Sequence, residues 1–171
     1  ARVIKVEAPN TGDDSRKFGP FIEDYSAYFM SLNRGKESIA LNLKNENDKK
    51  IFDKILSKAD ILVENFKPGT LEKWGYGWKD VNKRYPKLIY ASASGFGQTG
   101  PLKELPAYDM VVQGMGGLMS VTGQPNSEPT RVGTSIGDIT AGLFTTIGIS
   151  AALYDRQKTG KGMYIDVSML D

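Results

Sequence analysis

Short strand-like runs alternate along this chain with longer segments whose apolar residues recur at helical spacing. The strand-like runs are Arg2–Glu7, Ser38–Leu43, Asp60–Glu64, Leu88–Ala93 and Met163–Met169. Parallel strands need long crossover connections, and helices usually supply them, so this alternation is typical of a mainly parallel sheet. The sequence therefore predicts an α/β fold.

Four helices are expected between these strands. Asn45 can cap the first, whose apolar positions at helical spacing are Ile51, Phe52, Ile55, Leu56 and Ala59. Trp78–Arg84 predicts a second helix, which Pro86 stops, and a third is expected to begin near Tyr108 and Asp109. The stretch from Asp138 to about Asp155 is apolar or small nearly all round, which predicts a buried helix.

Charge and length exclude several classes of partner. A net charge of +2 is too small to indicate nucleic-acid binding, and Lys49, Lys50, Lys54 and Lys58 are interleaved with acidic residues as on a solvated helical face. No apolar run approaches the roughly 20 residues that span a bilayer, so no membrane partner is expected. The 171 residues suit one domain, and the chain is interpreted as an internal piece of a longer polypeptide, because it begins and ends in strands.

The chain has neither cysteine nor histidine. This absence excludes a thiolate nucleophile, an imidazole base, a Ser-His-Asp triad and a histidine-based zinc site within these residues. Any covalent chemistry here must use a carboxylate, a hydroxyl or a lysine.

Asp138 is the carboxylate in the most distinctive position. It lies between a glycine-containing loop and the long apolar segment, where the positive end of a helix would keep it ionised. The alternative is a helix cap, which stabilises by about 1 kcal/mol and has no further role. Tyr108 and Asp109 allow the same two interpretations, as an aromatic anchor with an acid in the first turn.

Two glycine motifs are weaker. Gly95–Gly100 matches the dinucleotide-binding spacing G-x-G-x-x-G after a strand, which would indicate an oxidoreductase, but Pro101 and Pro106 stand where that motif requires a helix. Loop turns are the favoured interpretation. Thr159–Gly162 resembles a phosphate loop only in part, and a tight turn between helix and strand is favoured there.

Many landmarks occur together in one order along the chain. They are Val3–Glu7, Gly12–Asp14, Asn33–Arg34, Lys36, Ser38–Ile39, Asp60–Phe66, Pro68–Gly69, Gly95–Pro101, Tyr108–Asp109, Gly116–Gly117, Thr122–Gly123, Gly137–Asp138 and Thr159–Gly162. In this combination the chain resembles the class III CoA-transferases. The resemblance covers all 171 residues but less than half of a family chain. It implies a Rossmann-like sheet with helices on both faces, with residues 1–171 forming the N-terminal part of a large, CoA-binding domain.

The resemblance also implies the reaction. Asp138 matches the family's nucleophile, which carries CoA as an aspartyl thioester from an acyl-CoA to a free carboxylic acid without a metal. Gly95–Gly123 is most similar to the enzymes that use succinyl-CoA with glutarate or a related dicarboxylate. The implied partners are acyl-CoA, a carboxylic acid and a second subunit in an interlocked homodimer. The implied compartment is the cytoplasm, or the mitochondrion in a eukaryote.

Family positions that contact CoA match a further set of residues. These are Leu41, Asn42, Leu43, Lys44, Asn65, Phe66, Lys67, Lys73, Leu105, Pro106, Ala107 and Tyr108. Lys67 and Lys73 would face the phosphates, although two ordinary surface lysines explain the pattern as well. Substrate positions match Phe18, Tyr28, Asp109 and Gly137, with core packing an equal alternative for Phe18 and Tyr28. Gly137 would leave space for the acyl group.

Two further alternatives come from the same resemblance. The α-methylacyl-CoA racemases of this superfamily pair the aspartate with a histidine close before Asp109, where this chain has Ala107 and no histidine. A racemase would therefore lack its second acid–base group. A truncated, non-catalytic CoA-binding module is the other alternative.

Overall fold

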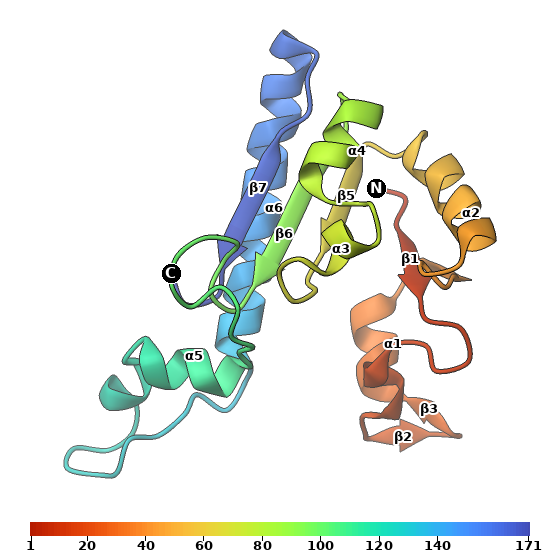
Figure 1. Cartoon of the computed structure of the whole chain (residues 1–171). Coiled ribbons are helices and arrows are strands. Elements are labelled where there is room, and N and C mark those ends of the chain that lie inside the picture. The colour runs from red at the N-terminus through yellow and green to blue at the C-terminus, as the bar shows by residue number, and fades with distance from the viewer. The chain divides into compact units, whose positions relative to one another are not determined.

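The computed structural model describes all 171 residues of the chain, which form two compact units (Figure 1). One unit runs from Ala1 to Ile55 and the other from Leu56 to Asp171. Each unit contains its own sheet of parallel strands. The expected α/β fold with a mainly parallel arrangement is confirmed.

The first unit is built on a parallel pair, β1 (Ile4–Glu7) and β4 (Glu37–Ala40). The connection between these strands contains a 3-10 helix η1 (Asp14–Lys17), the hairpin β2 (Phe21–Ile22) and β3 (Tyr25–Ser26), and helix α1 (Ala27–Asn33). The sequence predicted the two parallel strands, each slightly too long. It did not predict the hairpin or α1, whose apolar residues are largely exposed.

Helix α2 (Glu46–Leu56) follows β4 and begins where the sequence predicts. The side chain of Asn45 accepts hydrogen bonds from the backbone N–H groups of Asn47 at 2.8 Å and Asp48 at 3.3 Å, which confirms the cap. Phe52 and Leu56 are buried, as the helical spacing predicted, whereas Ile51 is exposed. The helix ends at Leu56, before the expected Ala59.

Glu7 is a buried carboxylate on which the first unit converges. It forms a bidentate pair with Arg16 at 2.8 Å for both bonds and accepts from the backbone N–H of Asp13 at 2.9 Å and the hydroxyl of Ser38 at 2.6 Å. The hydrogen bonds from Arg16 are the main reason why the pKa of Glu7 is lowered to about 2, against the opposing effect of burial. This carboxylate links β1, η1 and β4.

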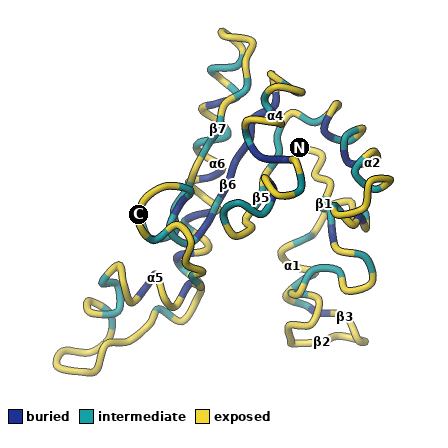
Figure 2. Tube along the Cα trace, in the orientation of Figure 1, coloured by how far each residue is buried: buried dark blue, intermediate teal, exposed yellow.

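The second unit contains a three-stranded parallel sheet in the order β5 (Ile61–Glu64), β6 (Ile89–Ser94), β7 (Tyr164–Ser168). The central strand β6 is buried except at Ala93, and its trace is mostly dark blue in Figure 2. A strand covered on both faces reads as a continuous buried run, which is why the sequence pattern located it well.

Helices cover both faces of this sheet. On one face, a Cβ placed on Gly148 of helix α6 (Ile136–Thr159) would lie 3.0 Å from Cγ2 of Ile165, so helix and strand are in close contact. On the other face, Trp78 of helix α4 (Trp78–Arg84) stacks on Tyr164 with ring centroids 5.6 Å apart. Ile165 and Tyr164 are adjacent on β7 and therefore point to opposite faces. The predicted arrangement of helices on both faces is confirmed for this sheet.

The prediction that the last helix is buried nearly all round is wrong. Helix α6 buries its small residues Gly137, Ala141, Thr145 and Ala152, while its large residues stay exposed. The exposed residues are Ile139, Leu143, Phe144, Ile147 and Tyr154. The composition of a helix does not reveal how many of its sides pack against other elements. In this unit α6 packs against the sheet, at β6 and β7, and against helix α5.

The helix is also longer than the sequence suggested, because it begins at Ile136 and reaches Thr159. Its 24 residues make it long and apolar enough to cross a membrane by length and composition alone, contrary to the expectation that no run approaches that length. Its small residues nevertheless pack on the sheet, as in a helix that covers the face of an α/β fold.

Replacing Glu7 with glutamine should destabilise the protein, because Arg16 loses its carboxylate and four hydrogen bonds lose a charged acceptor. The expected loss in the free energy of unfolding is about 2–3 kcal/mol, measured by urea denaturation. Glu37→Gln is a matched control, since Glu37 forms the same bidentate pair with Arg2 between side chains that are 55% and 73% exposed. The control should change stability little, and equal effects of both substitutions would contradict the role of Glu7.

The stabilisation by Glu7 should depend on pH with a definite sign. Its pKa in the folded protein is about 2, below the ordinary 4.5, so the contribution is complete above about pH 4.5 and is lost as pH falls through 2. The difference in the free energy of unfolding between wild type and Glu7→Gln should therefore shrink across that range.

Candidate active site

The candidate site lies where helices α5 (Asp109–Met115) and α6 meet the carboxyl edge of the β5-β6-β7 sheet. Past the ends of the strands, Met169 and Leu170 donate backbone hydrogen bonds to Ser94 and Gly95 at 2.9 and 3.2 Å. A Cβ placed on Gly137 would lie 3.8 Å from Cε of Met169, so the start of α6 reaches this edge. Ligands of parallel α/β sheets bind at this edge.

Asp138 is the third residue of α6, so the predicted helix start beside it is confirmed. The residue at the N-cap, Ser135, makes no capping hydrogen bond with its side chain. Its place is taken from another helix, because the backbone N–H of Gly137 donates to Oδ1 of Asp109 at 2.7 Å. The carboxylate that caps α6 is therefore that of Asp109, and the carboxylate of Asp138 takes no part in the cap.

Gln113 completes this junction, and sequence reasoning missed it. Its amide nitrogen donates to Oδ2 of Asp109 at 2.6 Å, and its amide oxygen accepts from the backbone N–H of Val132 at 2.8 Å. The same nitrogen lies 3.4 Å from the carbonyl oxygen of Thr134. Gln113 follows Asp109 by one helical turn, and that spacing is the signal that could have indicated the pair.

The carboxylate of Asp138 makes no hydrogen bond and no ion pair within the chain. Asp138 is an exposed residue, but partial desolvation of its carboxylate raises its pKa above the ordinary value, and the negative charge of Asp109 raises it further. The sequence predicted that the helix start would keep Asp138 ionised. Desolvation and the neighbouring carboxylate oppose that effect, because both favour the protonated form, and the ionised state of Asp138 stays a prediction.

Gly137 is required by close packing. A Cβ at this position would lie 2.8 Å from Cγ2 of Val112 and 3.1 Å from Oδ1 of Asp109. Glycine therefore lets α5 approach the first turn of α6 closely enough for the capping bond. The expected space for an acyl group stays a prediction.

Three of the residues expected to contact CoA lie directly after β5. The backbone N–H of Phe66 donates to the carboxylate of Glu64 at 2.9 Å, and the ring packs edge-on against Trp74 with centroids 5.5 Å apart. Lys67 precedes helix α3 (Thr70–Lys73), and Lys73 is its last residue. Both lysines and Asn65 are exposed, and neither lysine forms an ion pair.

The segment Leu105–Tyr108 leads into α5 and ends beside Asp109. Leu105, Pro106 and Tyr108 are exposed, the last by 83%. Ala107 packs on the loop after β6, where a Cβ on Gly95 would lie 2.5 Å from its methyl group. This predicted segment is therefore contiguous with the junction of α5 and α6.

The glycine loop after β6 contains no helix before α5, so it is not a dinucleotide-binding turn. Gly97 and Gly100 adopt positive φ angles of 75° and 84°, as loop glycines do. The rejection of the oxidoreductase interpretation is confirmed. Gly160 likewise has a φ of 68° and ends α6, which confirms the predicted turn after that helix.

The remaining expected residues belong to the first unit. Phe18 and Tyr28 are exposed and pack together with ring centroids 5.7 Å apart. Leu41 is buried in the core, whereas Asn42, Leu43 and Lys44 form a turn in which Asn42 Oδ1 accepts from the backbone N–H of Lys44 at 3.1 Å.

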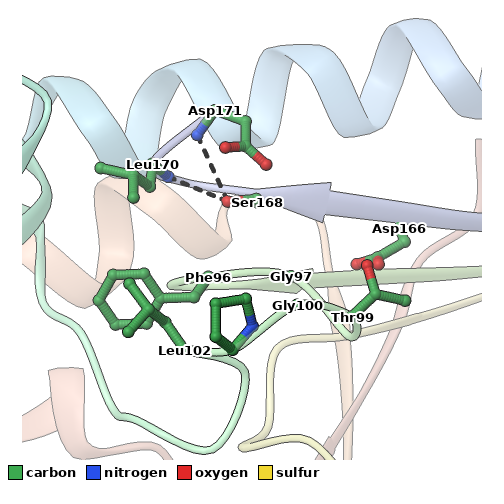
Figure 3. A pocket seen from close by; sticks show the side chains of 10 residues that line it. Phe96, Gly97, Thr99, Gly100, Leu102, Asp166, Ser168, Leu170 and Asp171 are labelled. Carbon is green, nitrogen blue, oxygen red and sulfur yellow. Dashed lines mark hydrogen bonds between the residues drawn. The ribbon is translucent and has the colours of Figure 1, made fainter.

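A cavity of about 290 Å³ lies at the carboxyl ends of β6 and β7 (Figure 3). Its walls include Phe96, Leu102, Asp166 and Ser168, and the carboxylate of Asp166 accepts from the backbone N–H of Gln98 at 2.9 Å. Asp138 does not line it. No cluster of three or more acidic residues in the structure could hold a metal ion, and the absence of a metal stays a prediction.

Comparison with known proteins gives the family. The model of CoA-transferase family III matches residues 1–171. The chain is 55% identical to the acetyl-CoA:oxalate CoA-transferase of Acetobacter aceti, covering 100% of this chain and 44% of that protein. It is 43% identical to the human succinyl-CoA:glutarate CoA-transferase, covering 99% and 39%. The crystal structure of a CaiB/BaiF family protein from Brucella suis superposes with a TM-score of 0.94 at 43% identity, covering 99% and 46%.

Fold and site together define an α/β protein in which the Asp138 carboxylate, at the carboxyl edge of the sheet, has no hydrogen-bond partner. The chain belongs to CoA-transferase family III. It spans less than half the length of these relatives.

Replacing Asp109 with asparagine should lower the pKa of Asp138, because the substitution removes the like charge that raises it. Carboxyl carbon NMR of aspartate-labelled protein, titrated with pH, measures the shift, and Asp138→Asn assigns the resonance. Asp155→Asn changes a charge near the other end of the same helix and should leave the pKa unchanged. An unchanged or raised pKa in Asp109→Asn would contradict the electrostatic coupling.

Two glycines on α6 should respond oppositely to alanine. Gly137→Ala should lower the free energy of unfolding by about 1–3 kcal/mol, because its methyl group overlaps Val112. Gly142→Ala meets nothing within 4 Å and should stabilise the helix by about 0.5–1 kcal/mol. Urea denaturation measures both, and stabilisation by Gly137→Ala would show that the helices do not meet as described.

Proposed function

We propose that this chain is the N-terminal part of the large domain of a longer class III CoA-transferase, and that Asp138 is its covalent nucleophile. The observation that carries the proposal is that two neighbouring carboxylates differ in their hydrogen bonds. Asp109 caps α6, and Asp138, one residue after the capped N–H, has no partner in the chain. A carboxylate on a capped helix start that is itself free of hydrogen bonds is available to attack a substrate.

The proposed reaction begins when a carboxylate oxygen of Asp138 attacks the thioester carbon of an acyl-CoA. The carbon–sulfur bond breaks, CoA thiolate leaves, and a mixed anhydride remains on Asp138. The thiolate then attacks the aspartyl carbonyl carbon, which releases the donor acid and forms an aspartyl-CoA thioester. The acceptor carboxylate repeats these steps in reverse order and leaves as its CoA ester, which restores Asp138.

This chemistry suits a chain region without histidine. An ionised carboxylate needs no general base to attack, unlike a serine hydroxyl. The raised pKa of Asp138 makes its ionised form a more basic nucleophile. Lys67 and Lys73, at the two ends of the α3 region and without ion pairs, would face the CoA phosphates as point charges.

The acceptor is proposed to be a dicarboxylic acid. The relatives reported above are named for transfer to oxalate and to glutarate, both dicarboxylates. Succinyl-CoA with glutarate is the proposed pair, and acetyl-CoA with oxalate is the pair that the relative with 55% identity suggests. The proposed assembly is an interlocked homodimer, in the cytoplasm or, in a eukaryote, the mitochondrion.

The longer protein that carries this chain should move CoA from succinyl-CoA or acetyl-CoA to a dicarboxylate. Chromatography of the CoA esters measures this transfer. The panel should contain glutarate, oxalate and malate, with butyrate as the monocarboxylate control. Asp138→Ala should lower the rate by about 10³-fold or more, as expected when a covalent nucleophile is removed. Asp155→Asn, a charge change on the same helix, should not.

Two outcomes would contradict the proposal. Transfer by Asp138→Ala at the wild-type rate would exclude it as the nucleophile. Incorporation of deuterium at the α-carbon of a 2-methylacyl-CoA, without CoA exchange, would favour the racemase alternative, for which Ala107 offers no acid–base group. Binding of CoA without turnover would favour the non-catalytic module.

A further inference from the structure

Gln113 is a buried polar side chain that hydrogen-bonds to residues of another segment as well as to its own helix. It is 2% exposed and lies on α5, one turn after Asp109. Its amide group donates to Asp109 at 2.6 Å, and it accepts from the backbone N–H of Val132 at 2.8 Å. Both ends of the amide are therefore used, one on a carboxylate and the other on a loop.

These contacts hold the start of α6 at two places, the segment that precedes the helix and the first turn of the helix. Val132 and Thr134 belong to the segment that leads directly into the helix, and the backbone N–H of Ile136 donates to the carbonyl of Thr134 at 2.8 Å. Asp109, held by Gln113, binds the N–H of Gly137. Asp138 is the next residue along the chain.

We infer that Gln113 is a positioning residue for the nucleophile: it holds Asp109 and the segment from Val132 to Thr134, and thereby sets where the Asp138 carboxylate lies. This inference rests on the proposed transfer reaction. Gln113 touches no reacting atom, and its effect passes through the backbone at the first turn of α6.

An amide is the side chain that these partners require. Asp109 Oδ2 needs a donor and the N–H of Val132 needs an acceptor, and only a group with both can serve them together. A carboxylate would place a second negative charge beside Asp109, and an apolar side chain would leave both groups buried and unpaired.

Positioning has a kinetic consequence that folding alone does not have. Displacement of a reacting group by about 1 Å can cost about 100-fold in rate, whereas binding of the distant CoA moiety need not change. Loss of Gln113 should therefore lower kcat and leave the KM for acyl-CoA nearly unaffected.

The test uses the longer protein and the CoA-transfer assay, with rates expressed per folded enzyme. Gln113→Met keeps the length of the side chain and removes both hydrogen bonds, so kcat should fall by about 10- to 100-fold. Gln113→Asn keeps the amide but is one methylene shorter and cannot reach both partners, so its kcat should be intermediate. Thr145→Val is the control, because Thr145 is also buried but bonds only to its own helix, at Ala141.

The control should lower stability without changing kcat. A wild-type kcat in either Gln113 variant would overturn the inference, as would a rise in KM that accounts for the whole loss. If Gln113→Met does not fold, Gln113→Asn decides the matter by the same criteria. Failure of the proposed function is distinct, because the wild type itself would then show no transfer, and the inference would fall with it.

Discussion

The hydrogen bond from the backbone N–H of Gly137 to the carboxylate of Asp109 is the contact on which the candidate site depends. It caps the longest helix of the chain from a neighbouring helix, because the side chain of Ser135 makes no cap. It also means that the Asp109 carboxylate is engaged in capping the helix, whereas the Asp138 carboxylate has no hydrogen-bond partner. The same negative charge acts on Asp138 and helps to raise its pKa. Stability of the helix start and reactivity of the next side chain are thus coupled through one carboxylate.

Local patterns predicted much of the fold. The short strand-like runs located β5, β6 and β7, and the Asn45 cap located α2, because these signals reside in consecutive residues. The starts of α5 and α6 were also predicted, since each has an acid in its first turn. Asp109 and Asp138 were consequently both identified as residues at helix starts from the sequence.

Long-range contacts could not be predicted in this way. Two of the partners of Gln113 lie 19 and 21 residues farther along the chain, where no periodicity connects them to it. The helix start was expected to keep Asp138 ionised, and only the structure shows that desolvation and the charge of Asp109 raise its pKa. Helix α6 was expected to be buried, because its composition is apolar. The three-stranded sheet of its unit covers only the side that carries small residues.

Mass spectrometry tests directly whether Asp138 forms a covalent bond with the substrate. The longer protein is incubated with succinyl-CoA or acetyl-CoA, digested, and its peptides are weighed before and after hydroxylamine treatment. A CoA thioester should appear on the peptide that contains Asp138, be removed by hydroxylamine and be absent from Asp138→Ala. Turnover without an adduct on that peptide, or an adduct on a different residue, would contradict this covalent role of Asp138.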